Sequence, residues 1–154
     1  MSKTIFIAEP GKQEISMART FDAPRARVFA AYINPEAVPR WWGPRSLTTV
    51  VDKLEAKKGG IWRFVQRDGA GHEFAFNGVY HEALSPERLV YTFEFEGMPG
   101  HVLLETVLFE EIEGKTRITS KSIFQSLEAR DGMMQSGAEA GAVETWDRLA
   151  ELLS

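Results

Sequence analysis

Apolar and polar residues alternate along much of the chain with the period of two that is typical of β-strands. Gln13 to Phe21 is the first clear stretch of this kind and follows a loose N-terminal segment. Asp22-Ala23-Pro24 then predicts a helix start, because proline suits the first helical position, where its missing N–H costs nothing. We expect this helix to end near Asn34-Pro35 and a second short helix to follow Pro35.

Strand after strand follows, separated by short turns rich in Gly, Pro, Asp and Lys. Asp68-Gly69-Ala70-Gly71, for example, is a turn of the hairpin type. The predicted strands are Leu47 to Ala56, Ile61 to Arg67, Glu73 to Leu84, Leu89 to Phe95, Val102 to Glu111 and Thr116 to Phe124. Short connections favour an antiparallel meander, so together with the first strand they predict a seven-stranded antiparallel sheet.

The chain ends in a short helical connection, Leu127 to Gln135, and a long helix predicted from about Gly137 to Leu153. The apolar face of the long helix has two unlike halves. The first half carries small residues, which are Ala138, Gly141, Ala142 and Thr145, and the second half carries the bulky Trp146, Leu149, Leu152 and Leu153. The bulky half can fill a core, whereas the small half leaves space between helix and sheet unless something else fills it.

The strands supply an aromatic surface for the opposite wall, since every second residue of a strand faces the same way. The residues that share a face within one strand are Trp62 and Phe64; Phe74, Phe76, Gly78 and Tyr80; and Leu89, Tyr91, Phe93 and Phe95. An aromatic sheet face opposite a small-residue helix face is typical of a ligand pocket. The alternative is that the aromatic side chains interlock into a dry core. Gly78 facing Ala142 would allow close backbone approach or leave a void.

Composition limits the classes of partner. The 154 residues are 44% hydrophobic and 26% charged, no linker or repeat divides them, and one domain (1–154, core about 13–153) is expected. A net charge of -4 without a basic stripe argues against nucleic acid and anionic membranes. The lack of cysteine excludes disulfides and thiolate metal sites. Without a visible secretory signal or a long apolar run, the protein is expected to be cytoplasmic.

Several stretches of the sequence together resemble one family. They are Phe21 to Pro44 (FDAPRARVFAAYINPEAVPRWWGP), Lys57 to Phe95 (KKGGIWRFVQRDGAGHEFAFNGVYHEALSPERLVYTFEF), Gly114 to Thr119 (GKTRIT) and Ala140 to Leu153 (AGAVETWDRLAELL). They are similar to the SRPBCC (START-like, Bet v-type) superfamily, and within it to homologues of the C-terminal domain of the activator of heat-shock-protein-90 ATPase. The resemblance covers nearly the whole chain from Gln13 onward.

The resemblance implies an α+β helix-grip fold, in which a curved sheet wraps around the long C-terminal helix and two short helices follow the first strand. It also implies a link to the stress response. Relatives commonly carry Trp at the position of Ala142 and Leu at the position of Trp146, so the cavity shape should differ from theirs. The eukaryotic chaperone activator depends on an additional N-terminal domain that this sequence does not show, so a chaperone partner is left unsupported.

Glu105 is the one weak candidate for a catalytic residue. Alternation places it on the same face as Leu103 and Val107. If that face lines the cavity, a carboxylate in an apolar pocket would have a raised pKa and could orient a ligand or act as a general acid or base. The sequence favours the other interpretation, in which Glu105 faces outward or pairs with Arg63 or Arg117.

Other polar motifs add little chemistry. Ser120 and Ser122 share a face and could give the pocket hydroxyl groups, but a serine without a nearby base is no nucleophile. The three histidines have no recognised metal-site spacing, so neither a metal nor a cofactor is expected. The Trp41-Trp42-Gly43-Pro44 turn could either frame the mouth of the cavity or simply pack against the sheet.

The sequence therefore predicts a domain that binds a small hydrophobic molecule between the sheet and the last helix. The expected lining residues are Trp41, Trp42, Phe64, Phe76, Phe93, Glu105, Met133, Met134, Ala142 and Trp146. Two alternatives remain open: an enzyme of cyclase or hydrolase type acting on a hydrophobic substrate, and a co-chaperone-like interaction module. Homodimerisation through an edge strand is also left open by the sequence.

Overall fold

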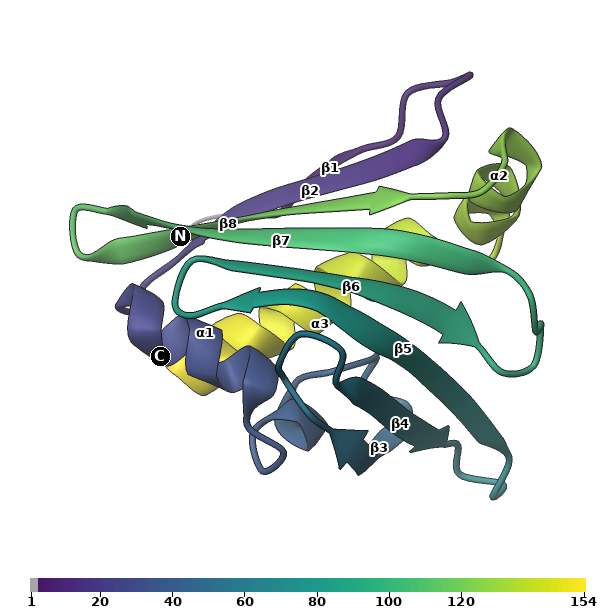
Figure 1. Cartoon of the computed structure of the whole chain (residues 1–154), viewed down its shortest axis with the longest axis horizontal. Helices are drawn as coiled ribbons and strands as arrows, with labels where there is room; N and C mark the ends of the chain where they lie inside the picture. Colours follow the sequence, from purple (N-terminus) through teal and green to yellow (C-terminus); the bar gives the residue numbers. More distant parts are fainter. Residues whose placement is uncertain (1–2) are drawn as a thin grey trace.

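One antiparallel sheet frames the part of the chain that the computed structural model describes, residues 3–154 (Figure 1). The strands are β1 (Ile5–Ile7), β2 (Glu14–Phe21), β3 (Thr48–Leu54), β4 (Ile61–Arg67), β5 (Glu73–Leu84), β6 (Arg88–Phe95), β7 (Val102–Ile112) and β8 (Lys115–Ile123). Their order across the sheet is β1-β2-β8-β7-β6-β5-β4-β3. The predicted meander is confirmed, because each strand from β3 to β7 pairs with the next strand in the sequence.

The sheet has eight strands within the described residues, so the predicted number of seven was wrong by one. The additional strand is β1, which lies in the segment expected to be loose and pairs with β2 alone. Ile5 and Ile7 face outward with about half of their surface exposed, whereas Phe6 packs against the inner side of the sheet. The sheet therefore begins at Ile5 and not at Gln13.

Three α-helices and one 3₁₀ turn complete the described fold: α1 (Arg25–Ile33), η1 (Val38–Arg40), α2 (Leu127–Gln135) and α3 (Ala138–Leu153). Pro24 is the N-cap of α1 and Asn34 its C-cap, so both predicted boundaries are correct to within one residue. The predicted second short helix is the 3₁₀ turn η1. Ser126 begins α2, because its hydroxyl accepts a hydrogen bond from the N–H of Ala129 at 3.0 Å.

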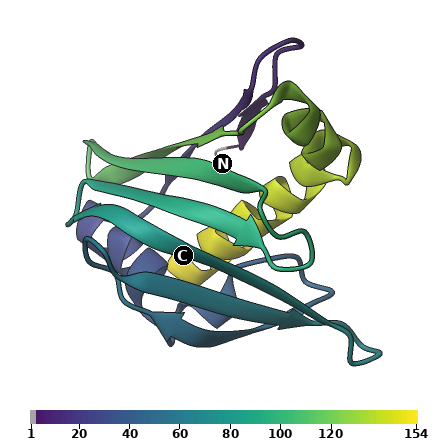
Figure 2. The same ribbon diagram turned by 45° about the vertical axis from the view of Figure 1, so that its right-hand side comes forward.

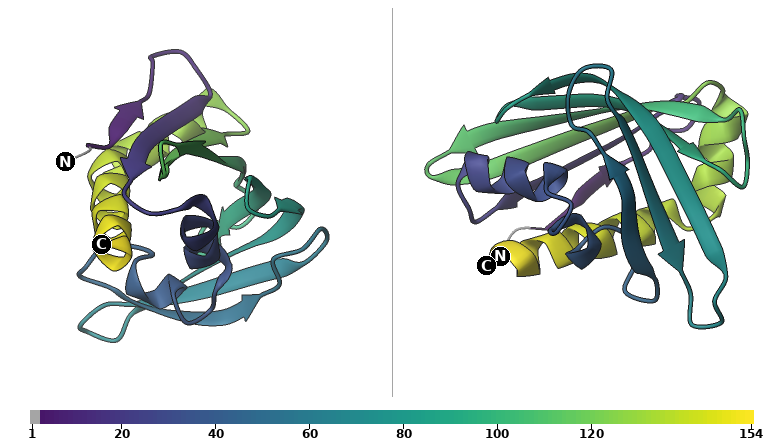
Figure 3. Two further views of the ribbon diagram at one scale, coloured as in Figure 1. Left: turned by 90° about the vertical axis from the view of Figure 1, so that its left-hand side faces the viewer. Right: turned by 60° about the horizontal axis from the view of Figure 1, so that its bottom comes forward.

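The sheet is strongly curved, and α1 and α3 lie on its concave side (Figures 2 and 3). Trp146 of α3 meets Phe21 of β2 edge to face, with 5.7 Å between ring centroids. Arg19 of β2 donates to the carboxylate of Asp147 at 2.6 Å and so ties the outer side of α3 to the same strand. The C-terminal helix is thereby held across the sheet, as the helix-grip prediction requires.

Two clusters of buried side chains stabilise the fold. The larger cluster joins α1, the bulky half of α3 and the middle strands, and its fully buried members include Phe109, Leu149 and Val28. Burial of each such side chain stabilises the fold by about 1.5–3 kcal/mol relative to exposure. The smaller cluster, around Leu103 and Phe124, lies beside α2. Across residues 3–154, no helix is long and apolar enough to cross a membrane.

Candidate functional site

A cavity of about 510 Å³ lies between the inner face of the sheet and the N-terminal half of α3. Members of both buried clusters bound it, so it occupies the gap that the two clusters leave between them. Its α3 wall consists of Gly137, Ala138, Gly141, Ala142, Thr145 and Trp146. All but the last of these residues are small, so the helix does not fill the space in front of the sheet. The volume lies within the range typical of small-molecule sites.

The wall that β4, β5 and β6 contribute is aromatic. Trp42 enters from the loop after η1 and meets Phe64 and Phe76 edge to face, with ring centroids 5.0 and 5.3 Å apart. Trp62 and Phe93 extend the same group, with 5.8 Å between their ring centroids. The four tryptophans of the sequence all line the cavity. Edge-to-face and tilted contacts hold the rings in fixed orientations and so give the apolar part of the site a defined shape.

The Trp41-Trp42-Gly43-Pro44 loop places two of these rings. Trp41 is buried, and its indole N–H donates to the carbonyl of Ala31 in α1 at 2.9 Å. The backbone then turns at Gly43, which has a φ of 90° and sits so close to Gln66 that a Cβ would lie 1.9 Å from the amide nitrogen. Only glycine fits that turn without strain. Trp41 is therefore anchored in the core, while the next residue can point its ring at the sheet.

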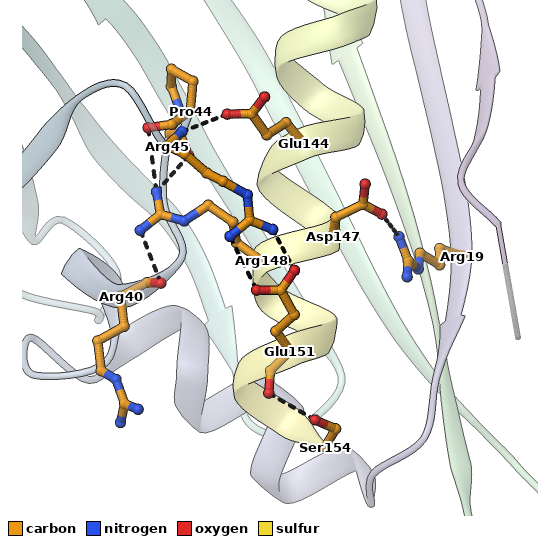
Figure 4. Close-up of polar contacts among 10 residues, drawn as sticks. Arg19, Arg40, Pro44, Arg45, Glu144, Asp147, Arg148, Glu151 and Ser154 are labelled. Atoms are coloured by element: carbon orange, nitrogen blue, oxygen red, sulfur yellow. Dashed lines mark hydrogen bonds and ion pairs between the residues drawn. The ribbon is translucent and has the colours of Figure 1, made fainter.

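Polar contacts from α3 fasten the same loop to the helix (Figure 4). Arg148 donates to the carbonyl of Gly43 at 2.7 Å. The backbone N–H of Arg45 donates to Glu144, and the guanidinium of Arg45 donates to Glu151. These contacts attach the loop that carries Trp42 to the helix that forms the opposite wall of the cavity. The two walls are therefore coupled on the outside of the site.

Glu105 lies on the inner face of β7 and lines the cavity. Ser120 donates to one of its carboxylate oxygens, and Ser122 donates to the other at 2.6 Å. The prediction that Glu105 faces outward or pairs with Arg63 or Arg117 was wrong, since its carboxylate binds the two serines and Arg63 instead binds Glu96 on the outer face at 2.8 Å. Burial raises the pKa of the Glu105 carboxyl above its ordinary value, and the two serine hydroxyls oppose that rise by stabilising the ionised form.

Tyrosine hydroxyls accompany this carboxylate. Tyr91 is the cross-strand neighbour of Glu105, and Tyr80 is the next neighbour in the same row across the sheet. Tyr32 of α1 accepts a hydrogen bond from the indole N–H of Trp146 at 3.1 Å. Burial, together with the charge of Glu105, raises the pKa of Tyr32 and of Tyr91 well above the ordinary value. Both phenols therefore stay neutral at physiological pH, and Glu105 is the group among them that can carry charge.

The sequence as a whole matches one family model, described as "Activator of Hsp90 ATPase homolog 1-like protein", over residues 22–154. The chain belongs to this family. The family membership and the helix-grip fold that the sequence resemblance implied are thus both confirmed. No curated protein matches the chain.

Several solved structures are similar to this chain in fold. A protein from Arthrobacter aurescens is 26% identical, has a TM-score of 0.90, and is matched over 97% of this chain and 90% of its own. A protein from Staphylococcus epidermidis is 30% identical with a TM-score of 0.80, covering 94% of this chain and 92% of its own. The AHSA1 protein from Silicibacter pomeroyi, 21% identical with a TM-score of 0.76 over 91% and 96% of the two chains, resembles this one in fold.

In this AHSA1-family chain, most of the residues proposed from the sequence surround the cavity. The nine that line it are Trp41, Trp42, Phe64, Phe76, Phe93, Glu105, Met133, Ala142 and Trp146. Met134 does not. It lies in a shallow groove on the outside of α3 beside Val143 and Glu144, and packs in part against the smaller buried cluster. Adjacent residues of a helix point about 100° apart, so Met133 and Met134 could not both face the cavity.

Gly78 has a different role from the one expected. It pairs with Trp62 of the neighbouring strand, and the Trp62 indole lies over it and donates to the carbonyl of Thr92 at 3.1 Å. A Cβ on Gly78 would lie 1.7 Å from that carbonyl oxygen. The close approach is therefore between Gly78 and Trp62. The expectation that Gly78 faces Ala142 was wrong, because Trp62 occupies the space in front of this glycine.

The cavity also has polar lining residues that were not predicted from the sequence, above all Tyr32 and Gln66. Tyr32 follows Val28 and Phe29 on the apolar side of α1, and this pattern could have revealed its direction. Gln66 alternates with Trp62 and Phe64 on β4, which likewise places it on the inner face. Within residues 3–154, no group of three or more His, Cys, Asp or Glu side chains is arranged to hold a metal ion.

Proposed function

We propose that this chain binds one small, mostly apolar molecule in the cavity between the sheet and the N-terminal half of α3. The observation that carries the proposal is the cavity of about 510 Å³, whose helix wall is made of small residues and whose sheet wall is aromatic. A dry core would have brought larger side chains into this space, because protein interiors are close-packed. The aromatic wall supplies apolar contact area, and Glu105 with its serine partners supplies a polar anchor.

The test is Ala142→Trp, with Ala140→Trp as its matched control. Ala142 lines the cavity, whereas Ala140 is exposed on the outer side of the same helix. Each purified protein is analysed by native mass spectrometry, and any bound molecule is extracted and identified. We expect an adduct on the wild type and on Ala140→Trp that is absent from a folded Ala142→Trp variant. The same adduct on all three proteins would place the bound molecule outside the cavity and refute the proposal.

The family description names an ATPase activator, which is a second candidate function. An activator that acts through its surface would not need an open cavity. Stimulation of a purified Hsp90 ATPase by the wild type and by a folded Ala142→Trp variant to the same extent would therefore support that function. Lack of stimulation by either protein would leave the cavity as the site of function.

A further inference from the structure

Over the part of the chain that the structure describes, the cavity contains one carboxyl group and no basic side chain that could balance its charge on ionisation. Among the described residues, Glu105 is the only Asp, Glu, Lys, Arg or His side chain that lines it. Its hydrogen-bond partners, Ser120 and Ser122, are neutral. A carboxylate withdrawn from water normally pairs with a cation, because desolvation of an unpaired charge is costly. No basic side chain among the described lining residues takes the place of that cation next to Glu105, so the place is open on the cavity side.

The two serines leave Glu105 able to accept further hydrogen bonds. A carboxylate has about four lone-pair positions. Ser120 uses a position on one oxygen and Ser122 a position on the other, so each oxygen keeps capacity for another donor. The serines lie on β8, directly beside β7, and so fix the plane of the carboxylate against the sheet. The carboxylate of Glu105 can therefore accept further hydrogen bonds from a bound molecule.

The surroundings of this carboxylate also favour a positive charge. Tyr91 is its direct cross-strand neighbour, and the charge of Glu105 acts on Tyr32 from α1. Further along the same wall lie the faces and edges of Trp42, Trp62 and Phe93. Aromatic faces attract ammonium groups through their quadrupole, and the attraction is largest where water is excluded. An anion would meet both the like charge of Glu105 and these electron-rich faces.

We propose that the cavity selects an organic cation: a molecule with an apolar, ring-sized body and one ammonium group that pairs with Glu105. This inference rests on the proposed function and names the class of ligand that the same cavity takes. The ammonium group donates to the free positions of the carboxylate, and the apolar body lies against the aromatic wall. A neutral molecule of the same shape gains the apolar contacts but leaves Glu105 without a counter-charge.

Three anthracene derivatives with one ring system and different charge test the proposal: 9-(aminomethyl)anthracene, 9-anthracenemethanol and 9-anthracenecarboxylic acid. Binding is followed near neutral pH through quenching of the intrinsic fluorescence, because all four tryptophans line the cavity. We expect the amine to bind the wild type at least about tenfold more tightly than the alcohol, which corresponds to one ion pair and its cation–π contacts. The carboxylic acid should bind more weakly than either.

The variants are Glu105→Gln and, as a control of equal charge change, Glu110→Gln on the exposed outer side of the same strand. Glutamine keeps the size of the side chain and an oxygen that can accept from Ser120 or Ser122. Glu105→Gln should weaken binding of the amine about tenfold and leave binding of the alcohol nearly unchanged, whereas Glu110→Gln should change the affinity for neither compound. Equal binding of amine and alcohol, or equal loss in both variants, would overturn the selection of a cation while leaving the binding function intact. Failure of all three compounds to bind would overturn the binding function itself.

Discussion

Replacing Ala142 with leucine asks whether the space in front of α3 is a void or a packed core. Leucine adds three carbon atoms to a side chain that faces the cavity. Burial of each contributes about 0.8 kcal/mol, or about 2.4 kcal/mol together. Ordering the leucine side chain costs about 0.5–1 kcal/mol. The net expectation is a stabilisation of about 1.5 kcal/mol, which raises the Tm of a domain of this size by roughly 3–6 °C.

Ala150→Leu on the same helix is the matched control. Ala150 is partly buried against the larger buried cluster and does not line the cavity, so the added carbons press against side chains that are already packed. Overpacking of a filled core costs about 1–3 kcal/mol, so this variant should be less stable than the wild type. Helix propensity cannot account for a difference in sign, since both variants exchange alanine for leucine within α3.

The assay is urea denaturation of both variants and the wild type, with thermal melting as a second measurement. The expected result is opposite signs of the change in unfolding free energy for Ala142→Leu and Ala150→Leu. If Ala142→Leu is destabilised as much as Ala150→Leu, the space in front of Ala142 is filled in solution. That result would rule out a ligand cavity in front of α3.

Three further predictions concern the surroundings of the cavity. Burial raises the pKa of Glu105 in the folded protein above the unfolded value of about 4.3. The wild type should therefore lose stability as the pH rises from about 4.3 through the folded pKa, whereas Glu105→Gln should not lose this contribution. Urea denaturation at a series of pH values should therefore show Glu105→Gln gaining stability over the wild type toward neutral pH, and a constant difference would contradict the burial of the charge. Gly78→Ala should lower the free energy of unfolding by about 3 kcal/mol or more, because the new Cβ would collide with the Thr92 carbonyl. An unchanged Tm in thermal melting would contradict this close approach. Arg148→Met removes the hydrogen bonds to the loop at Gly43 and should lower the free energy of unfolding by about 1–3 kcal/mol. Amide hydrogen exchange in that loop should become faster. Unchanged exchange would show that the contact does not hold the loop.

Local patterns predicted most of the fold, because alternation and turn residues act over a few neighbouring positions. The meander, α1 and α3 follow from such patterns, and so does the small half of α3. The strand β1 did not, since a three-residue strand that pairs on one side and exposes Ile5 and Ile7 leaves hardly any periodic signal. Its position depends on pairing with β2, which no periodic pattern within the three residues themselves can indicate.

The direction of Glu105 could not be read from its own strand. Its neighbours on the same face, Leu103 and Val107, are apolar, and a carboxylate among them would be penalised without partners. The partners come from β8, and the register of β7 against β8, which pairs Glu105 with Ser122 and Val107 with Ser120, is what brings them there. Register between strands depends on the whole sheet, so the sequence alone left the wrong interpretation favoured.

The order of the elements along the chain affects how this protein is made. The helix α3 forms one wall of the cavity, yet it follows all eight strands in the sequence. During synthesis, the strands that form the aromatic concave face leave the ribosome before the helix that covers it. Until α3 docks, Trp62 and Phe93 face water or any apolar surface nearby, a state that favours association between nascent chains. The time between emergence of β8 and docking of α3 is therefore the period in which newly made copies are most vulnerable to aggregation.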